Sequence, residues 1–246
     1  MQIAALIPAR LESSRFPGKL LKKIGDKSVI CHVYDNLVDT LLFDHVAVVC
    51  DHLSIYEEVV QNGGKAYLSK AEHDNGTSRI AEIAADLDFP VIFNVQGDEP
   101  FVNKDILASL IQLFIDDFDN TIDIVSPMNM IDEINIIENP NVVKVVTTID
   151  NYAMYFSRSP IPYHRNKSIS AKYYKHIGIY GFRKEALLKI TALPETPMDA
   201  SEMIECIKYL EHGMKIKMAL TQSQGVSIDT PEDLQEAIKF YNNQLH

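Results

Sequence analysis

The segment Ile3-Ala-Ala-Leu-Ile-Pro-Ala-Arg10-Leu-Glu-Ser-Ser-Arg15-Phe-Pro-Gly-Lys19 decides the fold class of this chain. Its apolar run from Ile3 to Ile7 stops at Pro8, and such a continuous run is typical of a parallel strand that is buried on both faces. The residues after it follow the carboxyl end of that strand, which is where open α/β sheets bind ligands. We therefore expect an α/β protein with a ligand-binding loop after its first strand.

This loop has the chemistry of a polyphosphate site, because it combines cations, hydroxyls and a glycine: Arg10, Ser13, Ser14, Arg15, Gly18 and Lys19. Arginine binds phosphate oxygens in pairs, lysine acts as a point charge, and glycine adopts positive φ freely. A single cation here would indicate an ordinary exposed loop, but three of them in a chain of net charge -11 favour a site. The G-x-x-x-x-G-K-[ST] and G-x-G-x-x-G patterns are missing, which disfavours ordinary NTPase and dinucleotide sites.

Composition narrows the class of protein further. With 246 residues and 46% hydrophobic content, the chain is expected to bury one substantial core. A sequence pI near 5.1 argues against nucleic-acid or anionic-membrane partners. No long apolar segment or targeting signal is apparent, and three widely spaced cysteines fit a reducing compartment. These features predict a soluble, unsecreted protein of the cytoplasm.

The hydrophobic pattern alternates between strands and helices along the first half of the chain. Strands are expected at 44–51, 65–69 and 91–96, and helices at 27–42, 55–62, 80–87 and 105–114. This βαβαβ order predicts a sheet with helices on both faces. Asp51, at the end of a strand, is interpreted as the cap of the following helix rather than as a site residue.

Two further segments of this half carry candidate site residues. Asp98 follows the strand in Asn94-Val-Gln-Gly-Asp-Glu-Pro100, and a carboxylate there suits Mg²⁺, which proteins hold with one or two carboxylates plus substrate phosphates. A turn is the alternative, and the basic loop in the same sheet favours the metal. In His73-Asp-Asn-Gly-Thr-Ser-Arg79, the start of a helix could offer an anion site, but the segment by itself favours a capping Thr or Ser with a solvated arginine.

In the second half of the chain, the residues by themselves predict fewer elements and fewer candidate site residues. Lys144 lies inside an apolar strand at 140–148 and is either a snorkelling residue or a site cation. A strand at 175–183 would place His176, Gly178, Tyr180 and Phe182 on one face. A helix at 199–212 is expected to begin at Asp199 or Ser201. Near the end, Thr230 and Asp233 cap a helix, which leaves Asp229 free.

Several motifs together resemble the signatures of the 3-deoxy-manno-octulosonate cytidylyltransferase (CMP-Kdo synthetase) family: Ile7-Pro-Ala-Arg10, Ser14-Arg15, Pro17-Gly-Lys19, Asn94 to Pro100 and His176-Ile-Gly-Ile-Tyr-Gly181. The resemblance spans nearly the whole chain. It implies a three-layer α/β/α Rossmann-like nucleotidyltransferase fold with a mostly parallel mixed sheet. It also implies the reaction of CTP with the acidic sugar Kdo, with Mg²⁺, to give CMP-Kdo and pyrophosphate for lipopolysaccharide biosynthesis.

The resemblance assigns roles to individual residues of this chain. The nucleotide is expected at Pro8, Ala9, Arg10, Ser13, Arg15, Lys19, Gly76, Thr77, Arg79 and Asp98. The sugar is expected at Gln96, Arg158, His176, Tyr180 and Glu205, with His176 facing its carboxylate. Asp98 and Asp229 are expected to hold Mg²⁺, and together with Arg10 and Lys19 they are the expected catalytic residues. The family also implies one domain over 1–246, with a nucleotide-binding half near 1–120 and a sugar-binding, homodimer-forming half near 121–246.

Four positions depart from the family pattern. Asn75 and Ser78 replace residues of the usual SGTER segment, and Cys206 and Lys208 stand where glutamine and arginine are expected. The departures keep two alternatives open, which are a modified acidic sugar such as 8-amino-Kdo and a base other than cytosine. A third alternative, from another class of protein, is a nucleotide-binding regulator without turnover.

Overall fold

The chain folds into two compact units. The structure, a computed structural model, describes residues 1–13, 15–222 and 227–244, so Ser14 of the first loop lies outside the described residues. Unit 1 comprises Met1–Leu107 and Gly225–His246, and unit 2 comprises Ala108–Gln224. The boundary thus falls before residue 120, and the C-terminal segment that contains Asp229 returns to unit 1.

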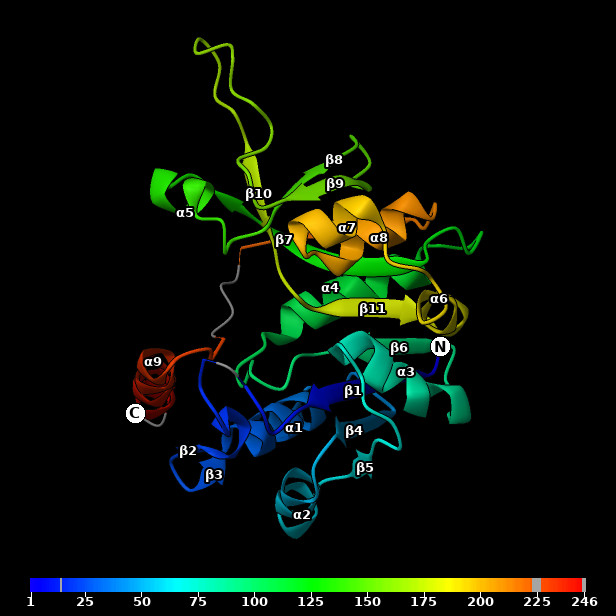
Figure 1. Ribbon diagram of the computed structural model, residues 1–246, viewed down its shortest axis with the longest axis vertical. Helices are drawn as coiled ribbons and strands as arrows, with labels where there is room; N and C mark the ends of the chain where they lie inside the picture. The colour runs from blue at the N-terminus through cyan, green and yellow to red at the C-terminus, as the bar shows by residue number, and fades with distance from the viewer. Residues whose placement is uncertain (14, 223–226, 245–246) are drawn as a thin grey trace. The chain divides into compact units, whose positions relative to one another are not determined.

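Unit 1 is built on a parallel sheet whose strands are β5 Ala66–Leu68, β4 His45–Cys50, β1 Ile3–Ala9 and β6 Val91–Asn94, in that spatial order (Figure 1). In chain order this arrangement is 3-2-1-4, as in a doubly wound nucleotide-binding half. Every residue of β1 is buried, as its continuous apolar run predicts. The order reverses between β1 and β6, and such a switch point is where ligands bind in open α/β sheets.

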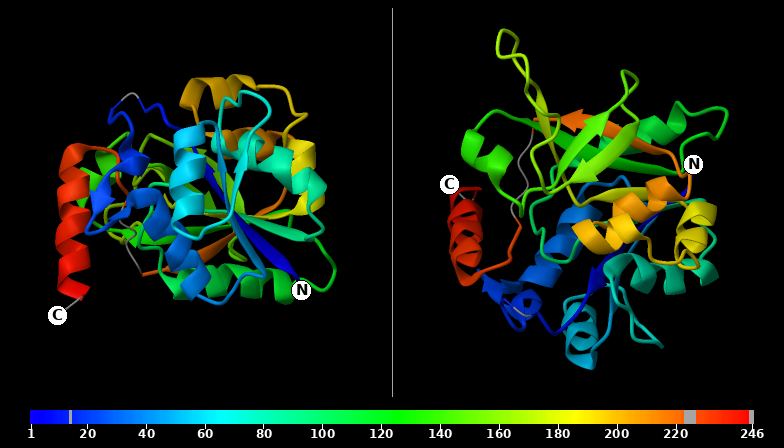
Figure 2. Two further views of the ribbon diagram at one scale, coloured as in Figure 1. Left: turned by 90° about the horizontal axis from the view of Figure 1, so that it is seen from below. Right: turned by 45° about the horizontal axis from the view of Figure 1, so that its top comes forward.

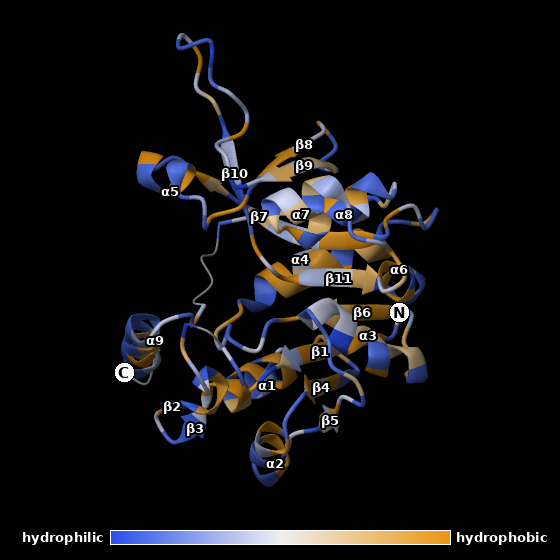
Figure 3. Cartoon of the chain, viewed as in Figure 1, coloured by the Kyte–Doolittle hydropathy of each residue, from blue (hydrophilic) through white to orange (hydrophobic). Residues whose placement is uncertain are grey.

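Helices cover this sheet on the pattern that the sequence predicts. Helices α1 Val29–Asp39, α2 Leu53–Gln61 and α3 Gly76–Asp86 pack on its strands (Figure 2). The strands are predominantly apolar, whereas helix α2 has one polar and one apolar face (Figure 3). A 3₁₀ turn η1 Lys19–Leu21, a hairpin of β2 Lys23–Ile24 and β3 Lys27–Ser28, and helix α9 Pro231–Gln244 complete the unit.

One capping prediction in unit 1 is wrong. The Nδ1 atom of His52 accepts the hydrogen bond from the backbone N–H of Ser54 at 3.1 Å, so His52 caps helix α2 in place of Asp51. The Asp51 carboxylate instead accepts from the backbone N–H of Leu11 at 3.0 Å, in the loop after β1. A helix cap and a loop anchor have the same local pattern, and the long-range partner decides between them.

Unit 2 is centred on strand β7 Ile124–Ile131. This strand pairs antiparallel with β10 Tyr173–His176 and β11 Tyr180–Arg183, and parallel with β12 Ile216–Thr221. Strand β8 Lys144–Thr147 pairs with β10 and with β9 Ala153–Ser157. The helices of this part are α5 Ile134–Glu138, α6 Lys184–Ile190, α7 Pro197–Glu202 and α8 Glu205–Glu211, while α4 Lys104–Ile115 crosses the unit boundary. The sheet of unit 2 is therefore mixed.

Two expected elements of unit 2 are each divided. The strand expected at 175–183 is interrupted between His176 and Tyr180, so the single period-two face predicted for it does not form. The helix expected at 199–212 becomes α7 and α8 because Met203 adopts the left-handed conformation, with φ of 52°. Thr196, rather than Asp199 or Ser201, caps α7 by accepting from the backbone N–H of Asp199.

The surroundings of Lys144 decide whether this residue is a site cation. It is fully buried, and its ammonium donates to the backbone carbonyls of Asn139, Val142 and Arg158. Three acceptors satisfy all three hydrogens of an ammonium group. Lys144 therefore stabilises the connections around β8 and β9 and is not a site cation.

None of the helices in the described part of the chain has the length and apolar character needed to cross a membrane.

Candidate functional site

A pocket of about 360 Å³ lies in unit 1 at the carboxyl ends of β1 and β6. Ten of the residues predicted from the sequence line it: Pro8, Arg10, Ser13, Arg15, Lys19, Gly76, Arg79, Gln96, Asp98 and Asp229. Its charged lining comprises four cations and three carboxylates, although the whole chain has a net charge of -11. The volume lies within the range of small-molecule sites, and the local excess of positive charge suits an anionic ligand.

Two carboxylates in the pocket converge on one ammonium group. The Nζ atom of Lys19 lies 2.5 Å from Oδ2 of Asp98 and 3.0 Å from Oδ1 of Asp229. An Nη2 atom of Arg15 contacts the same Asp229 oxygen at 2.9 Å. The oxygens of Asp98 and Asp229 are therefore close enough to contact a single cation.

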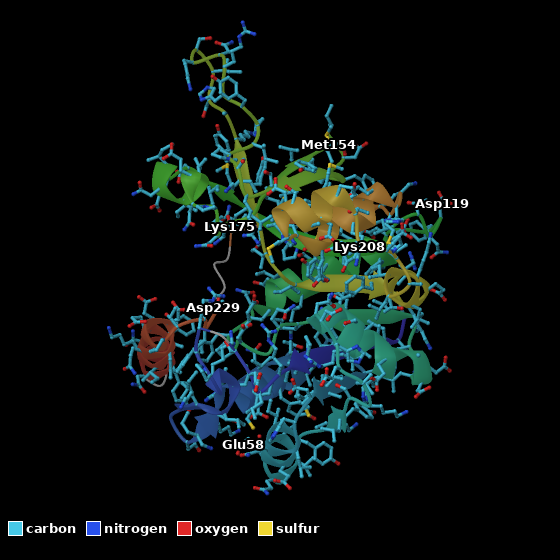
Figure 4. The ribbon with its side chains drawn as sticks, viewed as in Figure 1. Glu58, Asp119, Met154, Lys175, Lys208 and Asp229 are labelled. Carbon is cyan, nitrogen blue, oxygen red and sulfur yellow. The ribbon has the colours of Figure 1, made fainter. Side chains whose placement is uncertain are left out.

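The backbone explains how residues so far apart in sequence meet here. The N–H of Ile228 donates to the carbonyl oxygen of Asp98 at 2.9 Å, which places Asp229 beside it (Figure 4 labels Asp229). At the start of α9, the Asp233 carboxylate accepts from the backbone N–H of Thr230 at 2.8 Å, and Thr230 Oγ1 accepts in return. This cap confirms the prediction for Thr230 and leaves the Asp229 side chain to face the cations.

Gly97 permits the close approach of the two strand ends. A Cβ atom at this position would lie 2.9 Å from the carbonyl oxygen of Pro8, closer than real Cβ contacts allow. Gly18, on the other side of the pocket loop, has φ of 66°, in the left-handed region that glycine tolerates. Both glycines therefore shape the backbone that surrounds the pocket.

The amino end of helix α3 forms another wall of the pocket. Asn75 caps it, because its Oδ1 accepts from the backbone N–H of Ser78 at 2.8 Å, and the Ser78 hydroxyl donates to the Asn75 carbonyl. The usual SGTER segment places Ser and Glu at the same N-cap and N3 positions, which is a capping-box pattern. The departures at Asn75 and Ser78 thus concern the helix cap.

Arg79 is almost fully buried in this wall. One Nη2 atom lies 3.5 Å from the Asp51 carboxylate, and its buried Nε has no hydrogen-bond partner among the described residues. Because a buried unpaired donor is costly, Arg79 is well placed to donate to a ligand. Asp51 holds both this guanidinium and the loop after β1.

Two residues predicted to bind the nucleotide do not bring their side chains to the pocket. Ala9, the last residue of β1, is buried. Thr77, in the first turn of α3, is buried, and its Oγ1 atom accepts from the Asn94 amide at 3.5 Å. Alternation along β1 turns the Ala9 side chain away from the side of Pro8, and helix α3 buries Thr77.

His73 is a pocket residue that the sequence analysis did not select. It lines the pocket, and its Nε2 atom lies 2.7 Å from the Glu82 carboxylate. The segment 73–79 contained the signal, because it precedes a helix at the sheet edge where the ligand was expected. Gly76, Thr77 and Arg79 were selected by the resemblance to the SGTER segment, which begins two residues after His73 and does not include it.

The remaining predicted sugar residues lie in unit 2, whereas Gln96 lies in unit 1. The Arg158 guanidinium donates to the backbone carbonyls of Pro140, Glu202 and Met203. Arginine has five donors, so two of its N–H groups have no acceptor among the described residues and are left for a ligand.

Two other predicted sugar residues, His176 and Tyr180, belong to a cluster of rings. The His176 ring lies edge-on to Phe156, with centroids 5.1 Å apart, and 5.4 Å from the ring of Tyr180. Its Nε2 atom is 2.9 Å from the hydroxyl of Ser126. Burial lowers the pKa of His176 to about 4, so the ring is neutral at pH 7. The contact between His176 and the sugar carboxylate that the resemblance implies stays a prediction, and the ring would meet the sugar as a neutral imidazole.

The surroundings of Cys206 define the chemistry of this departure from the family pattern. The thiol is buried and donates to the Tyr180 hydroxyl at 3.2 Å, and burial raises its pKa to about 12. It is therefore a neutral thiol behind Tyr180.

Glu205, in the first turn of α8, accepts from the Tyr209 hydroxyl at 2.8 Å through one oxygen.

A cation-rich pocket at a switch point, with two carboxylates close enough to hold a metal ion, fits a nucleotidyltransferase of the α/β class. Comparisons with known proteins agree. A cytidylyltransferase family model matches residues 4–216. The 3-deoxy-manno-octulosonate cytidylyltransferase of Christiangramia forsetii is 50% identical over 97% of this chain and 96% of its own length, and that of Flavobacterium johnsoniae is 49% identical over 96% and 97%. This chain belongs to the 3-deoxy-manno-octulosonate cytidylyltransferase family.

Solved structures agree with this assignment. The structure of a CMP:2-keto-3-deoxy-manno-octonic acid synthetase complexed with CTP matches 99% of this chain and 100% of its own length, with 32% identity and a TM-score of 0.94. A 4-diphosphocytidyl-2C-methyl-D-erythritol synthase from Anaerococcus prevotii has only 14% identity and a TM-score of 0.62, and shares the fold alone. The predicted α/β nucleotidyltransferase fold is confirmed.

Proposed function

We propose that this protein transfers CMP from CTP to the anomeric hydroxyl of Kdo and releases pyrophosphate. The observation that carries the proposal is the meeting of Asp98, Asp229 and Lys19 in a cation-lined pocket of a chain 50% identical to a cytidylyltransferase of that specificity. The product is a CMP-sugar that serves lipopolysaccharide biosynthesis.

The triphosphate is assigned to the loop after β1. Arg10, Arg15 and Lys19 neutralise its charge, and Arg79 with the start of α3 supplies further donors. The sugar hydroxyl forms a bond to the α-phosphorus, the bond to the pyrophosphate oxygen breaks, and the hydroxyl proton leaves to solvent or phosphate. Positioning and charge neutralisation account for catalysis here, since the attack brings two anions together.

A Mg²⁺ ion is proposed as the cofactor. The described residues contain no cluster of three or more metal-ligating side chains, and Mg²⁺ requires only one or two carboxylates when substrate phosphates provide the rest. Asp98 and Asp229 fit this requirement, because the Lys19 ammonium already stands between their oxygens as a cation. When bound, the ion would neutralise phosphate charge.

The sugar is assigned to Gln96, Arg158, His176, Tyr180 and Glu205. Arg158 retains two N–H donors, and Glu205 retains an oxygen that is not bonded to Tyr209. Lys208 and the buried thiol of Cys206 keep a second candidate open, namely the same reaction on a modified acidic sugar.

Pyrophosphate release decides the reaction. With CTP and Mg²⁺, release is expected only when Kdo is added, and Asp98→Asn is expected to lower it at least about hundredfold. Replacing CTP by UTP, ATP or GTP tests the base, and 8-amino-Kdo tests the modified sugar. A protein that binds CTP but releases no pyrophosphate with any ulosonate would instead be a regulator, and the proposal would be wrong.

We also propose that the protein is a homodimer formed through unit 2. Nine of the twelve large apolar side chains that are more than half exposed, in the described part of the chain, belong to this unit, among them Met154 at 61% and Ile149 at 100%. A concentration of exposed apolar side chains marks an interaction surface.

The cytoplasm is the compartment that we propose for the reaction. The free, buried thiols of Cys31, Cys50 and Cys206 suit its reducing conditions.

The oligomeric state tests this proposal directly. Analytical ultracentrifugation is expected to show a dimer, and Met154→Glu combined with Ile149→Glu is expected to yield monomers. Leu41→Glu is the control, since Leu41 is 86% exposed in unit 1. A monomeric wild type would contradict the proposal.

A further inference from the structure

Ser126 occupies a buried position beside the interruption between β10 and β11. It lies on β7, and its residue is fully buried. Its hydroxyl oxygen is 2.8 Å from the carbonyl oxygen of Ile179, 3.2 Å from that of Ile177, and 2.9 Å from Nε2 of His176. The hydroxyl therefore has three neighbours within hydrogen-bond distance.

The number of hydrogens decides how these contacts are made. A serine hydroxyl has one hydrogen, and carbonyl oxygens can only accept. If the hydrogen pointed to His176, the hydroxyl oxygen would face two carbonyl oxygens with no hydrogen between them, a costly arrangement in a buried site. The hydrogen therefore goes to a carbonyl, and Ser126 accepts from an N–H of His176.

This choice defines the tautomer of the imidazole. A neutral histidine carries one hydrogen, on either Nδ1 or Nε2. Since Nε2 donates to Ser126, Nδ1 carries a lone pair and can only accept. Burial keeps the ring neutral, as its pKa near 4 indicates.

The acceptor atom remains available to a ligand. No described residue forms a hydrogen bond with Nδ1, and this atom is not among the buried unpaired polar atoms of the described residues. The edge-on contact with Phe156 and the contact with Tyr180 hold the ring in place. A fixed ring with one open lone pair selects a donor, such as a hydroxyl, and repels a carboxylate.

We propose that Ser126 is a positioning residue that holds His176 as the Nε2-protonated tautomer, so that Nδ1 accepts a hydrogen bond from a hydroxyl of the sugar. The inference rests on the proposed function, because it assigns a sugar hydroxyl to this atom. The carboxylate of the sugar is then bound by other groups.

Nitrogen NMR of histidine-labelled protein reads the tautomer without turnover. At pH 7, the long-range ¹H–¹⁵N pattern of His176, assigned by its loss in His176→Phe, is expected to show a hydrogen on Nε2 and none on Nδ1. In Ser126→Ala the pattern is expected to shift toward a mixture of tautomers. A hydrogen on Nδ1, or on both nitrogens, in the wild type would overturn the proposal.

Steady-state kinetics test whether Ser126 acts through His176. Ser126→Ala and His176→Phe are each expected to raise KM for Kdo about fivefold, the effect of one net hydrogen bond, with KM for CTP unchanged. The double variant is expected to match His176→Phe, because residues that act through one contact are not additive. Ser28→Ala, which removes an equally buried hydroxyl in unit 1, is the control.

Additive effects, or equal losses for CTP and Kdo, would show that Ser126 is only structural and would overturn the proposal. Failure of the proposed function is distinguishable: a wild type that releases no pyrophosphate with Kdo refutes the reaction, whereas the NMR pattern still decides the tautomer.

Discussion

Lys19→Met is expected to raise the affinity of the nucleotide-free protein for Mn²⁺, a paramagnetic substitute for Mg²⁺. In the wild type, the Lys19 ammonium contacts both carboxylates that are proposed to hold the metal. A divalent cation can bind both of them only after these contacts break. The nucleotide assists this step, since its phosphates offer Lys19 an alternative partner. Removing the ammonium therefore frees Asp98 without the nucleotide and leaves Asp229 paired with Arg15 alone.

The expected gain is about tenfold to hundredfold. The contact with Asp98 joins side chains that are only 12% and 22% exposed, so it resembles a charge-assisted hydrogen bond of about 1.5–3 kcal/mol. The Asp229 contact adds little, because that carboxylate is 36% exposed and is shared with Arg15. Each 1.4 kcal/mol corresponds to about a tenfold change in the dissociation constant.

The assay is electron paramagnetic resonance of free Mn²⁺ titrated with protein that has no nucleotide. Arg10→Gln is the matched control: it removes a cation from the same pocket, and no described carboxylate forms an ion pair with Arg10. The control is expected to weaken CTP binding and to leave Mn²⁺ affinity near the wild-type value. An unchanged affinity in Lys19→Met would refute the reasoning. An equal gain in Arg10→Gln would show that only net charge matters.

Three further outcomes test other parts of the structure. Lys144→Met should lower the free energy of unfolding by about 3 kcal/mol in chemical denaturation, because it leaves buried carbonyls without their donor. Burial opposes ionisation of Asp117, yet donors including Arg183 lower its pKa to about 2. Its contribution of about 2 kcal/mol is therefore complete above about pH 4 and lost as the pH falls toward 2, and Asp117→Asn should flatten that part of the stability curve. Asp51→Asn should weaken CTP binding in calorimetry about fivefold, since it loosens Leu11 and Arg79 without altering the pocket lining.

Local patterns were sufficient for several backbone features of unit 1, although they missed the breaks in unit 2 after His176 and at Met203. The apolar run before Pro8 predicted a buried parallel strand, and the Thr230 cap was correctly placed. The glycine at 18 allowed either a close approach of the backbone or a positive φ, and the structure has the positive φ. Each of these features depends on groups within a few residues of one another, so the sequence contains both partners. The resemblance then supplied the class of enzyme and most of the pocket lining.

The partners of polar side chains were decided only by the tertiary structure. Asp51 and Lys144 each allowed two interpretations, and the loop or the carbonyls that resolved them lie on segments brought close by folding. A backbone hydrogen bond from Ile228 to Asp98 brings Asp229 beside Asp98. Ser126, on a neighbouring strand, determines which ring nitrogen of His176 carries the hydrogen. Periodicity reports which face of an element is buried, but a hydrogen bond or an ion pair depends on distances of about 3 Å between distant segments, which only the packed chain defines.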